Sequence, residues 1–288
     1  MITRFAPSPT GPLHLGHAFS ALLAHDMARA AKGRFLLRIE DIDRSRCRPE
    51  WEQQIHDDLR WLGITWDGDV MRQSSRLSHY AAALDQLWRA GLLYPCTCNR
   101  RDIQAASQAP QEGAPIHGPD GVIYPGTCRT IPIDPHAARP RQDVALRLNI
   151  AKAVARLGGT ELGFEETGTG PLGQTGWIDL RQTDFTATLG DVVLARRDMG
   201  TSYHLSVVLD DAAQGVSDVI RGADLFEATQ IHVLLQELLA LPRPRYHHHR
   251  LIRDATGKRL AKRDDARAIA KFRAEGASPD DIRAMVGL

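Results

Sequence analysis

The sequence has no long apolar run, little net charge and few cysteines. No stretch approaches the roughly 20 apolar residues that a transmembrane helix needs, and the N-terminus lacks the pattern of a secretory signal peptide. These absences predict a cytoplasmic protein without a membrane partner. The formal net charge of +1 argues against a strongly basic protein that coats RNA, although it leaves room for a local basic patch. Four cysteines in 288 residues are too few for a disulfide framework.

The composition is that of an ordinary globular protein. Apolar residues make up 43% of the chain and charged residues 25%. A length of 288 residues is enough for one large domain or two modest ones.

The N-terminal stretch carries the strongest pattern. A short strand over Ile2–Ala6 runs into a turn rich in proline and glycine, and a helix follows over Leu15–Ala31. The free N–H groups and the dipole at the start of a helix attract anions. His14 and His17 are one helical turn apart, so both can face one phosphate chain, and Gly16 lets the backbone approach a flat base closely. Turns of this kind before helices are common, so this stretch alone does not decide the function.

An acidic cluster follows the next predicted strand, Phe35–Ile39. Strand, helix and strand in this order predict a parallel βαβ unit, in which ligands bind beyond the carboxyl ends of the strands. Glu40 lies at such an end and is a candidate partner for the ammonium group of an amino acid. For Asp41 and Asp43, a solvated acidic loop is an equally good explanation.

Three cysteines, at positions 96, 98 and 128, lie within 33 residues. Thiolates are strong zinc ligands, and in an intracellular chain this spacing favours a metal site over a disulfide. A tetrahedral structural site needs a fourth donor, for which Tyr124, His117 and His136 are all in range. The alternative is a set of free or buried thiols.

The other elements are predicted less sharply. Residues 151–176 are weakly patterned, and Thr201–Asp211 is predicted to be a buried strand that runs into acidic residues. The basic stretch Gly257–Arg263 is, in isolation, a solvated loop. The remaining predictions are helices over Pro49–Leu62, Leu77–Ala90 and Leu225–Leu239, strands over Val144–Ile150, Asp191–Ala195 and the start of Asp218–Asp224, and two short C-terminal helices, the second after Ser278-Pro279.

Two distant stretches resemble the paired signatures of class I aminoacyl-tRNA synthetases. The string from Arg4 to His17 resembles the first signature, in the form typical of the glutamate-specific branch, and Arg259–Arg263 resembles the second. Between them, residues 34–43 and 203–224 resemble the glutamyl synthetase pattern. Ala261 departs from the second signature, where the family usually has serine.

The resemblance implies an α/β fold, a Rossmann-type class I synthetase catalytic domain with an inserted zinc-binding subdomain, a short helical C-terminal segment and no anticodon-binding domain. The expected parts are the first half of the catalytic domain (1–95), the insertion (96–195), its second half (196–250), and the loop of the second signature with the C-terminal helices (251–288). Because only about 25 residues follow the second signature, the match narrows to the truncated family of glutamyl-queuosine tRNA(Asp) synthetases.

That family implies ATP-dependent activation of L-glutamate to glutamyl-adenylate, with Mg²⁺ bound to ATP. Transfer to queuosine, the modified wobble base of tRNA(Asp), would follow. Two alternatives are glutamylation of the 3′ end of tRNA(Glu) and a non-catalytic, synthetase-like RNA-binding protein. The early end of the chain argues against the first, and the full set of histidines, arginines and Lys262 against the second. A monomer is expected.

Residue roles are also implied by the resemblance. The catalytic residues would be His14, His17 and Lys262, which with Gly16 would also bind ATP. The glutamate-binding residues would be Arg4, Phe5, Ala6, Pro7, Ser8, Glu40, Tyr203 and Arg221, with the two arginines as carboxylate ligands in an order that the sequence leaves open. One structural zinc ion would be held by Cys96, Cys98, Tyr124 and Cys128, which favours Tyr124 as the fourth ligand.

Overall fold

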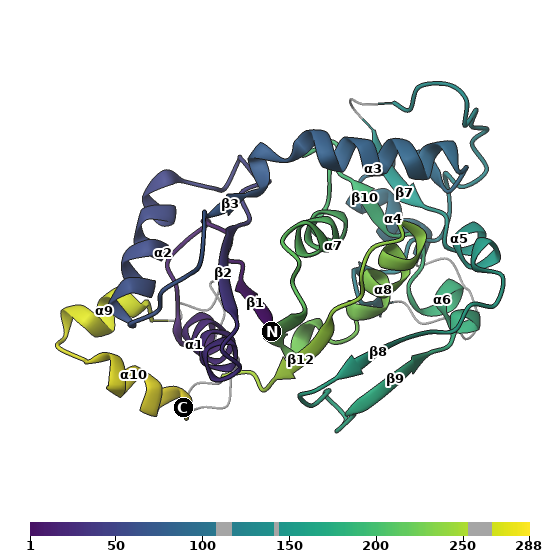
Figure 1. Ribbon diagram of the computed structural model, residues 1–288. Helices are drawn as coiled ribbons and strands as arrows, with labels where there is room; N and C mark the ends of the chain where they lie inside the picture. Colours follow the sequence, from purple (N-terminus) through teal and green to yellow (C-terminus); the bar gives the residue numbers. More distant parts are fainter. Residues whose placement is uncertain (108–116, 141–143, 253–266) are drawn as a thin grey trace.

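The computed structural model describes residues 1–107, 117–140, 144–252 and 267–288, and its two lobes flank strand β1 (Figure 1). In the N-terminal lobe, β1 (Ile2–Phe5) pairs in parallel with β2 (Arg34–Ile39), and β2 pairs in parallel with β3 (Met71–Arg72). The connection from β1 to β2 is the helix α1 (Leu15–Ala30). The predicted parallel βαβ unit is therefore confirmed.

The second lobe continues from β1 into another sheet. Strand β11 (Asp218–Gly222) pairs in parallel with β12 (Arg245–His249), β12 with β8 (Leu162–Glu166), and β8 is antiparallel to β9 (Gly176–Leu180). The Ser217 backbone N–H donates to the Ile2 carbonyl oxygen at 3.0 Å, which fixes the start of β11 beside β1. The carboxyl ends of β1, β2, β11 and β12 thus lie along one edge, where a ligand site is expected in such sheets.

A separate antiparallel sheet holds the cysteine region. It consists of β4 (Leu93–Cys96), β7 (Ala145–Leu148) and β10 (Val193–Ala195), in the order β10–β7–β4. Beside this sheet the chain forms α4 (Arg100–Ser107), the short hairpin of β5 (His117–Gly118) and β6 (Gly121–Val122), and α6 (Gln182–Thr188). In the N-terminal lobe α2 (Pro49–Trp61) follows β2, and the 3-10 turn η1 (Gln73–Ser75) leads from β3 into α3 (Leu77–Arg89), which runs toward the cysteine sheet (Figure 1). Strands β8 and β9 fall within the range expected for the insertion, yet β8 pairs with β12 and β9 pairs with β8, outside this sheet.

Two predictions were wrong. Residues 201–211 do not form a strand: Tyr203–Ala213 is the helix α7, whose N-cap Ser202 accepts a hydrogen bond from the Leu205 N–H through its hydroxyl. Nearly the whole helix is buried between α3 and the helix α8 (Thr229–Leu238), so its apolar run has no polar face and resembles a buried strand. The stretch 151–176 is also more regular than predicted, because Asn149 and Gly158 cap the helix α5 (Ile150–Leu157) and β8 follows.

The C-terminal helices close the N-terminal lobe. After the 3-10 turn η2 (Ala223–Leu225), α8 and β12, the described chain resumes with α9 (Ile269–Ala274) and α10 (Pro279–Val286). Helix α10 lies on α1, where Arg283 forms an ion pair with Asp26 at 2.7 Å. Both C-terminal helices were predicted, and the second begins at Pro279, one residue earlier than predicted, with Ser278 as its N-cap.

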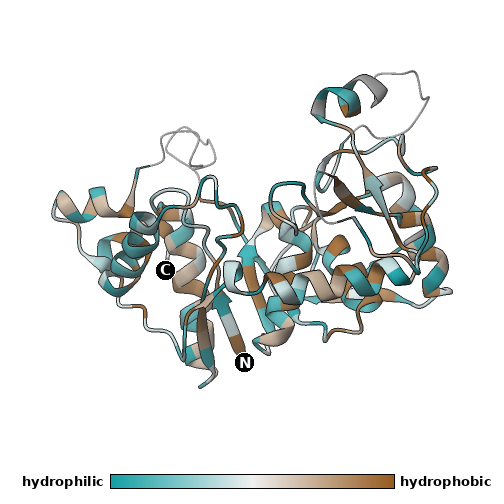
Figure 2. Cartoon of the chain, turned by 90° about the horizontal axis from the view of Figure 1, so that it is seen from above, coloured by the Kyte–Doolittle hydropathy of each residue, from teal (hydrophilic) through white to brown (hydrophobic). Residues whose placement is uncertain are grey.

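Apolar residues concentrate on the inner strands and on the helix faces that cover them, as the hydropathy colouring shows (Figure 2). One hydrophobic cluster fills each lobe. Within the part of the chain that the structure describes, no helix is long and apolar enough to cross a membrane.

Candidate active site and cysteine cluster

The two predicted catalytic histidines, His14 and His17, cap the N-terminus of α1. His14 is the N-cap, and its Nδ1 accepts a hydrogen bond from the Gly16 N–H at 3.1 Å. The His17 Nδ1 accepts in return from the His14 N–H at 3.2 Å, and the two rings lie 3.8 Å apart. A Cβ atom at Gly16 would be 3.0 Å from the His14 ring, so a larger residue here would push that ring out of its capping position by a few tenths of an ångström. Because capping uses Nδ1 of each ring, Nε2 is the atom that each ring could offer to a phosphate.

The end of the loop that bears the second signature lies against this turn. Residues 253–266, and with them Lys262 and Ala261, lie outside the described residues. The chain resumes at Arg267, and the Ile269 N–H donates to the Leu13 carbonyl oxygen at 2.8 Å, beside a bridge between Ala268 and His14. The segment that follows the second signature is therefore joined directly to the start of α1, although the two are about 250 residues apart in the sequence.

Four buried charges form a compact cluster at the ends of β1 and β2. The Asp211 carboxylate accepts from Nε of Arg4 at 3.0 Å and from Nη1 of Arg38 at 2.7 Å, and Arg38 also donates to Glu40 at 3.3 Å. Burial alone would raise the pKa of Asp211, but Arg4 and Arg38 outweigh it and lower that pKa. For Glu40 burial prevails over Arg38 and Arg4, and its pKa is raised. Two cations and two anions balance here, and we call this set the paired cluster.

Arg221, at the end of β11, has a different environment. Its Nε donates to Nε2 of His248 at 3.0 Å, its Nη1 meets Nδ1 of His232 at 3.0 Å, and its Nη2 donates to the Thr229 hydroxyl at 2.6 Å. Burial and the charge of Arg221 hold the pKa of His232 well below its ordinary value, and burial also lowers the pKa of His248. Among the described residues no carboxylate forms an ion pair with Arg221, so only neutral groups contact this cation.

The other predicted substrate residues lie around these two sets. Tyr203 begins α7, and its hydroxyl interacts electrostatically with Arg221, Glu40 and Arg4, while burial raises its pKa. The Pro7 carbonyl oxygen accepts from the Glu40 N–H at 3.0 Å, which holds the end of β1 against the end of β2. Ala6 and Ser8 are partly exposed beside it, whereas the Phe5 ring belongs to the hydrophobic core. The structure therefore brings Arg4, Glu40, Tyr203 and Arg221 together.

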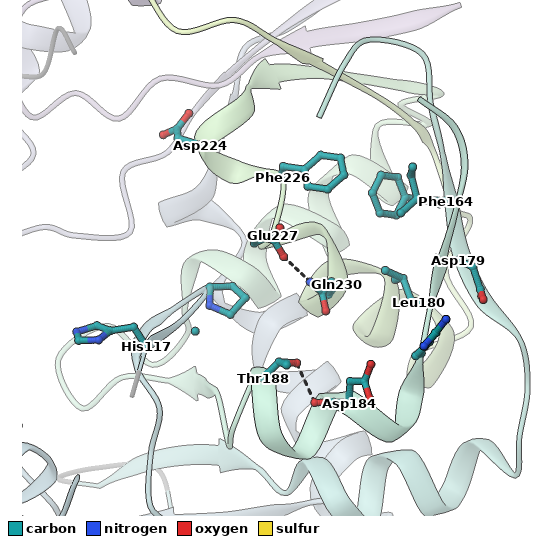
Figure 3. Close-up of a pocket in the computed structure, with 14 residues that line it drawn as sticks. His117, Phe164, Asp179, Leu180, Asp184, Thr188, Asp224, Phe226, Glu227 and Gln230 are labelled. Atoms are coloured by element: carbon teal, nitrogen blue, oxygen red, sulfur yellow. Dashed lines mark hydrogen bonds between the residues drawn. The ribbon is translucent and has the colours of Figure 1, made fainter. Parts of the chain in front are cut away.

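A pocket of about 830 Å³ lies between the β5 hairpin, β8, β9, α6 and the start of α8 (Figure 3). Phe226 forms part of its wall, and the ring of Phe226 lies 5.1 Å from the His248 ring and 5.7 Å from that of Phe164. His117, an alternative zinc ligand in the sequence, lines this pocket. The pocket also contains several carboxylates, among them Asp179 and Glu227, so it is not an anion site.

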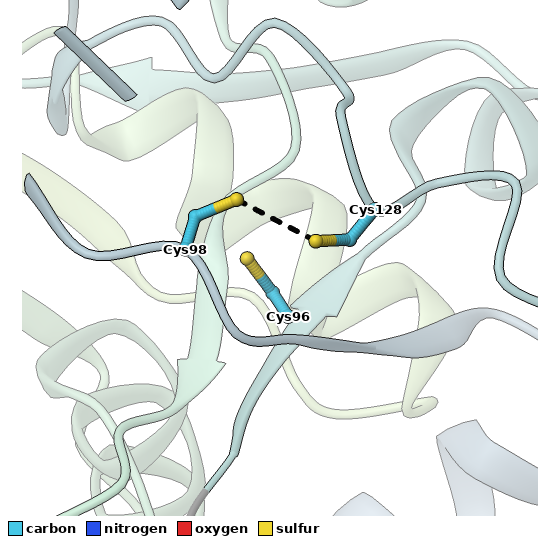
Figure 4. A group of neighbouring side chains, drawn as sticks. All are labelled: Cys96, Cys98 and Cys128. Carbon is cyan, nitrogen blue, oxygen red and sulfur yellow. Dashed lines mark hydrogen bonds between the residues drawn. The ribbon is translucent and has the colours of Figure 1, made fainter. Parts of the chain in front are cut away.

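The three cysteines converge (Figure 4). The Sγ atoms of Cys96, Cys98 and Cys128 lie within 4.8 Å of one another, and those of Cys98 and Cys128 are 3.5 Å apart. Around a tetrahedral zinc ion, Zn–S bonds of about 2.3 Å place neighbouring sulfur atoms roughly 3.8 Å apart, so this donor set fits the metal. The Tyr124 hydroxyl is 3.5 Å from Sγ of both Cys96 and Cys98. His117 and His136 are described but do not belong to the group.

The surroundings act differently on the members of this cluster: burial raises the pKa of Cys98 and of Tyr124, whereas the pKa of Cys128 is lowered. The guanidinium of Arg147 lies over the Tyr124 ring at 3.8 Å. Burial opposes ionisation of Cys128, but hydrogen bonds from Tyr124, the Thr97 backbone and the other thiols lower its pKa to about 7. The fourth cysteine, Cys47, lies outside the group.

The sequence analysis did not identify the buried residues that surround Arg4 and Arg221. Arg38 stands in an apolar strand and Asp211 in an apolar run, and a charged residue in such a setting signals a buried partner. His232, His248 and Glu166 gave a weaker signal, because β12 was not predicted and the segment around Glu166 seemed irregular.

Comparison with known protein families gives a consistent result. The family model described as "tRNA synthetases class I (E and Q), catalytic domain" matches residues 1–150 and 176–288. A protein named glutamyl-Q tRNA(Asp) synthetase from Rhodobacter capsulatus is 66% identical over 288 residues, which cover 100% of both chains. Another of that name from Nocardia farcinica is 43% identical over 98% of this chain and 82% of its own length.

Solved structures show the same fold. The crystal structure of a glutamate tRNA ligase from Elizabethkingia meningosepticum, in complex with its amino acid, has a TM-score of 0.75 at 25% identity. It aligns with 100% of this chain, which spans 60% of the length of that solved chain. A methionyl-tRNA synthetase from Mycobacterium tuberculosis, with a TM-score of 0.58 and 12% identity over 99% of this chain and 63% of its own, shares the fold alone.

Proposed function

Because the chain belongs to the glutamyl-Q tRNA(Asp) synthetases, within the glutamate and glutamine group of class I tRNA synthetases, we propose that it activates L-glutamate with ATP and transfers it to queuosine in tRNA(Asp). The observation that carries the proposal is the convergence of Arg221, Arg4, Glu40 and Tyr203 at the carboxyl ends of parallel strands, in a fold whose first helix begins with His14 and His17. This arrangement provides cations for carboxylates, an anion for an ammonium group, and a helix N-terminus for phosphates.

Activation joins the glutamate α-carboxylate to the α-phosphate of ATP and releases pyrophosphate. No covalent bond to the protein is needed, so the residues position the reactants and stabilise charge. His14 and His17 would contact the phosphates through Nε2, and Lys262 would meet the charge that develops on pyrophosphate, together with Mg²⁺. The contact of Ile269 with Leu13 supports a role for the second signature at this place.

Glutamate is selected by its two carboxylates and its ammonium group. Arg221 would bind one carboxylate, because its contacts among the described residues leave N–H groups without an anion. Glu40, whose pKa is raised by burial, would bind the ammonium group, and that cation would favour the ionised carboxylate; Tyr203 would lie between Glu40 and Arg221. Glutamine carries one negative charge less, and a site built around a polar partner can reject such an analogue by about 10⁴-fold.

The experiment is glutamate-dependent pyrophosphate–ATP exchange without RNA, followed by charging of queuosine-containing tRNA(Asp) and of tRNA(Glu). Exchange, with transfer only to tRNA(Asp) that contains queuosine, is expected. Transfer to the 3′ end of tRNA(Glu) would instead establish the alternative acceptor. Absence of exchange with every RNA present would leave a binding protein on a synthetase fold.

We also propose that Cys96, Cys98, Cys128 and Tyr124 hold one zinc ion, since their ligand atoms lie close together. The ion would be structural, because four protein ligands leave no open position for water. Cys128→Ser should lower the bound zinc well below one per chain and reduce the thermal stability, whereas the matched control Cys47→Ser should retain the metal. Metal analysis and melting curves measure both. Full zinc retention in Cys128→Ser would contradict the ligand set.

A further inference from the structure

A buried acid stands behind Arg221 and has no role in the proposed chemistry. Glu166, at the end of β8, is 1% exposed. One of its oxygens, Oε1, accepts from the backbone N–H groups of Gly168 at 2.8 Å and His248 at 2.9 Å. The other, Oε2, contacts Nδ1 of His248. Among the described residues, the hydrogen bonds of this carboxylate therefore end at His248 or in its own turn.

These contacts fix which ring nitrogen of His248 carries the proton. Two backbone donors hold Oε1, and the pKa of Glu166 is lowered overall, since the hydrogen bonds from His248 and Gly168 outweigh burial. A carboxylate only accepts hydrogen bonds, so the proton of the neutral ring must lie on Nδ1. The Nε2 lone pair is then available to Arg221, whose Nε–H donates to it at 3.0 Å.

The tautomer in turn orients the guanidinium. Arg221 has five N–H bonds, and His248, His232 and Thr229 engage one on each nitrogen. One N–H therefore remains on each Nη, the number that a carboxylate accepts in a bidentate contact. If His248 carried its proton on Nε2, that N–H would face the Nε–H of Arg221, and the guanidinium would have to turn.

We propose that Glu166 is a positioning residue for substrate binding: it holds His248 as the Nδ1–H tautomer and thereby aims Arg221 at a carboxylate of glutamate. This inference rests on the proposed function. It concerns a residue outside the family match, because the matched ranges end at residue 150 and resume at 176. The segment thus contributes to the active site through β8, although it does not touch the substrate.

The decisive variant is Glu166→Gln, which keeps the size of the side chain. The two backbone donors require an oxygen at the Oε1 position, so the amide NH₂ must face Nδ1 of His248. The ring must then accept at Nδ1 and carry its proton on Nε2. We expect the KM for glutamate in pyrophosphate exchange to rise about tenfold, the scale of one hydrogen bond to a charged group, with the KM for ATP unchanged. Glu165→Gln, on the exposed face of the same strand, is the matched control and should behave as wild type.

Two further measurements separate positioning from simple destabilisation. ¹⁵N NMR of histidine-labelled protein, assigned with His248→Ala, should show Nδ1–H in the wild type and Nε2–H in Glu166→Gln. In the His248→Ala background, Glu166→Gln should no longer change the KM for glutamate, because the ring that transmits the effect is absent.

The possible outcomes are distinct. Nε2–H in wild-type His248 would overturn the inference even if Glu166→Gln proved difficult to fold. In folded Glu166→Gln, an altered tautomer with an unchanged KM for glutamate would also overturn it. Absence of exchange in the wild type, with the Nδ1–H tautomer observed, would instead overturn the proposed function and with it the substrate role of Arg221.

Discussion

Arg4 and Arg221 are both buried and both lie toward the ends of parallel strands. Their neighbours differ, however, in charge. Arg4 meets Asp211 directly at 3.0 Å, inside a cluster whose charges balance. Arg221 meets two histidines and a threonine, and the acid of its network, Glu166, is held on the far side of His248. The same side chain is thus placed once in a direct ion pair and once among neutral acceptors.

The difference indicates that the two arginines have different roles, one in substrate binding and one in stability. A buried cation without a direct counter-ion is costly unless a ligand supplies one, so Arg221 is the arginine poised for an incoming carboxylate. Arg4 is already neutralised, and its pairing with Asp211 stabilises the junction between β1 and α7. Arg4 can still contact substrate, but we expect its main contribution to be structural.

The largest expected effect comes from unbalancing the paired cluster. Asp211→Asn leaves Arg4 and Arg38 without their shared anion, and breaking a buried pair in this way costs about 3–5 kcal/mol. Chemical denaturation should show this loss in the free energy of unfolding. The control is Asp198→Asn, at an exposed position with only a weak ion pair, which should change stability little. A loss below that of the control would mean that the cluster is not held by its charges.

The same cluster predicts a pH dependence. The pKa of Asp211 is lower in the folded protein than in the unfolded chain, because Arg4 and Arg38 outweigh burial. Its contribution to stability is therefore present above the unfolded pKa, and it is lost as the pH falls through the folded value. Wild type should lose stability to acid more steeply than Asp211→Asn.

Removing the other arginine should break binding instead of folding. Arg221→Met should raise the KM for glutamate by about 10²-fold or more, since truncating one partner of a buried charge pair costs roughly 2–5 kcal/mol. Its free energy of unfolding should fall less than that of Asp211→Asn. Arg245→Met, on the neighbouring strand with a half-exposed pair to Asp218, is the control and should leave the KM unchanged. Equal KM values for the two variants would remove Arg221 from the site.

Substitution of Glu40 tests a residue that belongs to the paired cluster and is also proposed to bind substrate. Glu40→Gln removes the charge proposed for the ammonium group while keeping its size, and we expect a rise of roughly tenfold in the KM for glutamate. Because burial raises the pKa of Glu40, the wild-type KM should also rise as the pH falls toward that raised pKa. The variant should lack this pH dependence. Asp43→Asn, in the adjacent loop, is the control, and a pH profile shared by both variants would exclude Glu40 as the titrating group.

Local signals were enough to predict much of the fold. The βαβ unit and most helices followed from apolar periodicity, capping residues and glycine turns, and the cysteines followed from zinc chemistry. Helix α7 could not be predicted, because burial on every side removes the periodicity that separates a helix from a buried strand. The residues of the candidate site were predicted, but not the different surroundings of Arg4 and Arg221, which depend on Asp211, Glu166 and His248. They are far from the arginines in sequence, so only tertiary contacts reveal these pairings.

The smallest expected effect concerns a buried acid that, unlike Asp211, meets a cation only at a longer distance. Asp58, on α2, is fully buried and accepts no hydrogen bond from the described residues, with Arg273 of α9 at 3.7 Å. Burial outweighs Arg273 and raises its pKa to about 6, so the ionised form destabilises the fold as the pH rises through that value. Asp58→Asn should therefore raise the melting temperature at pH 8 by about 2 °C, on the order of 1 kcal/mol for a chain of this size, and change it less at pH 5. Since Asp58 belongs to no proposed site, the KM for glutamate should stay the same. A lower melting temperature at pH 8 would show that the contact between Asp58 and Arg273 outweighs the cost of burying the carboxylate.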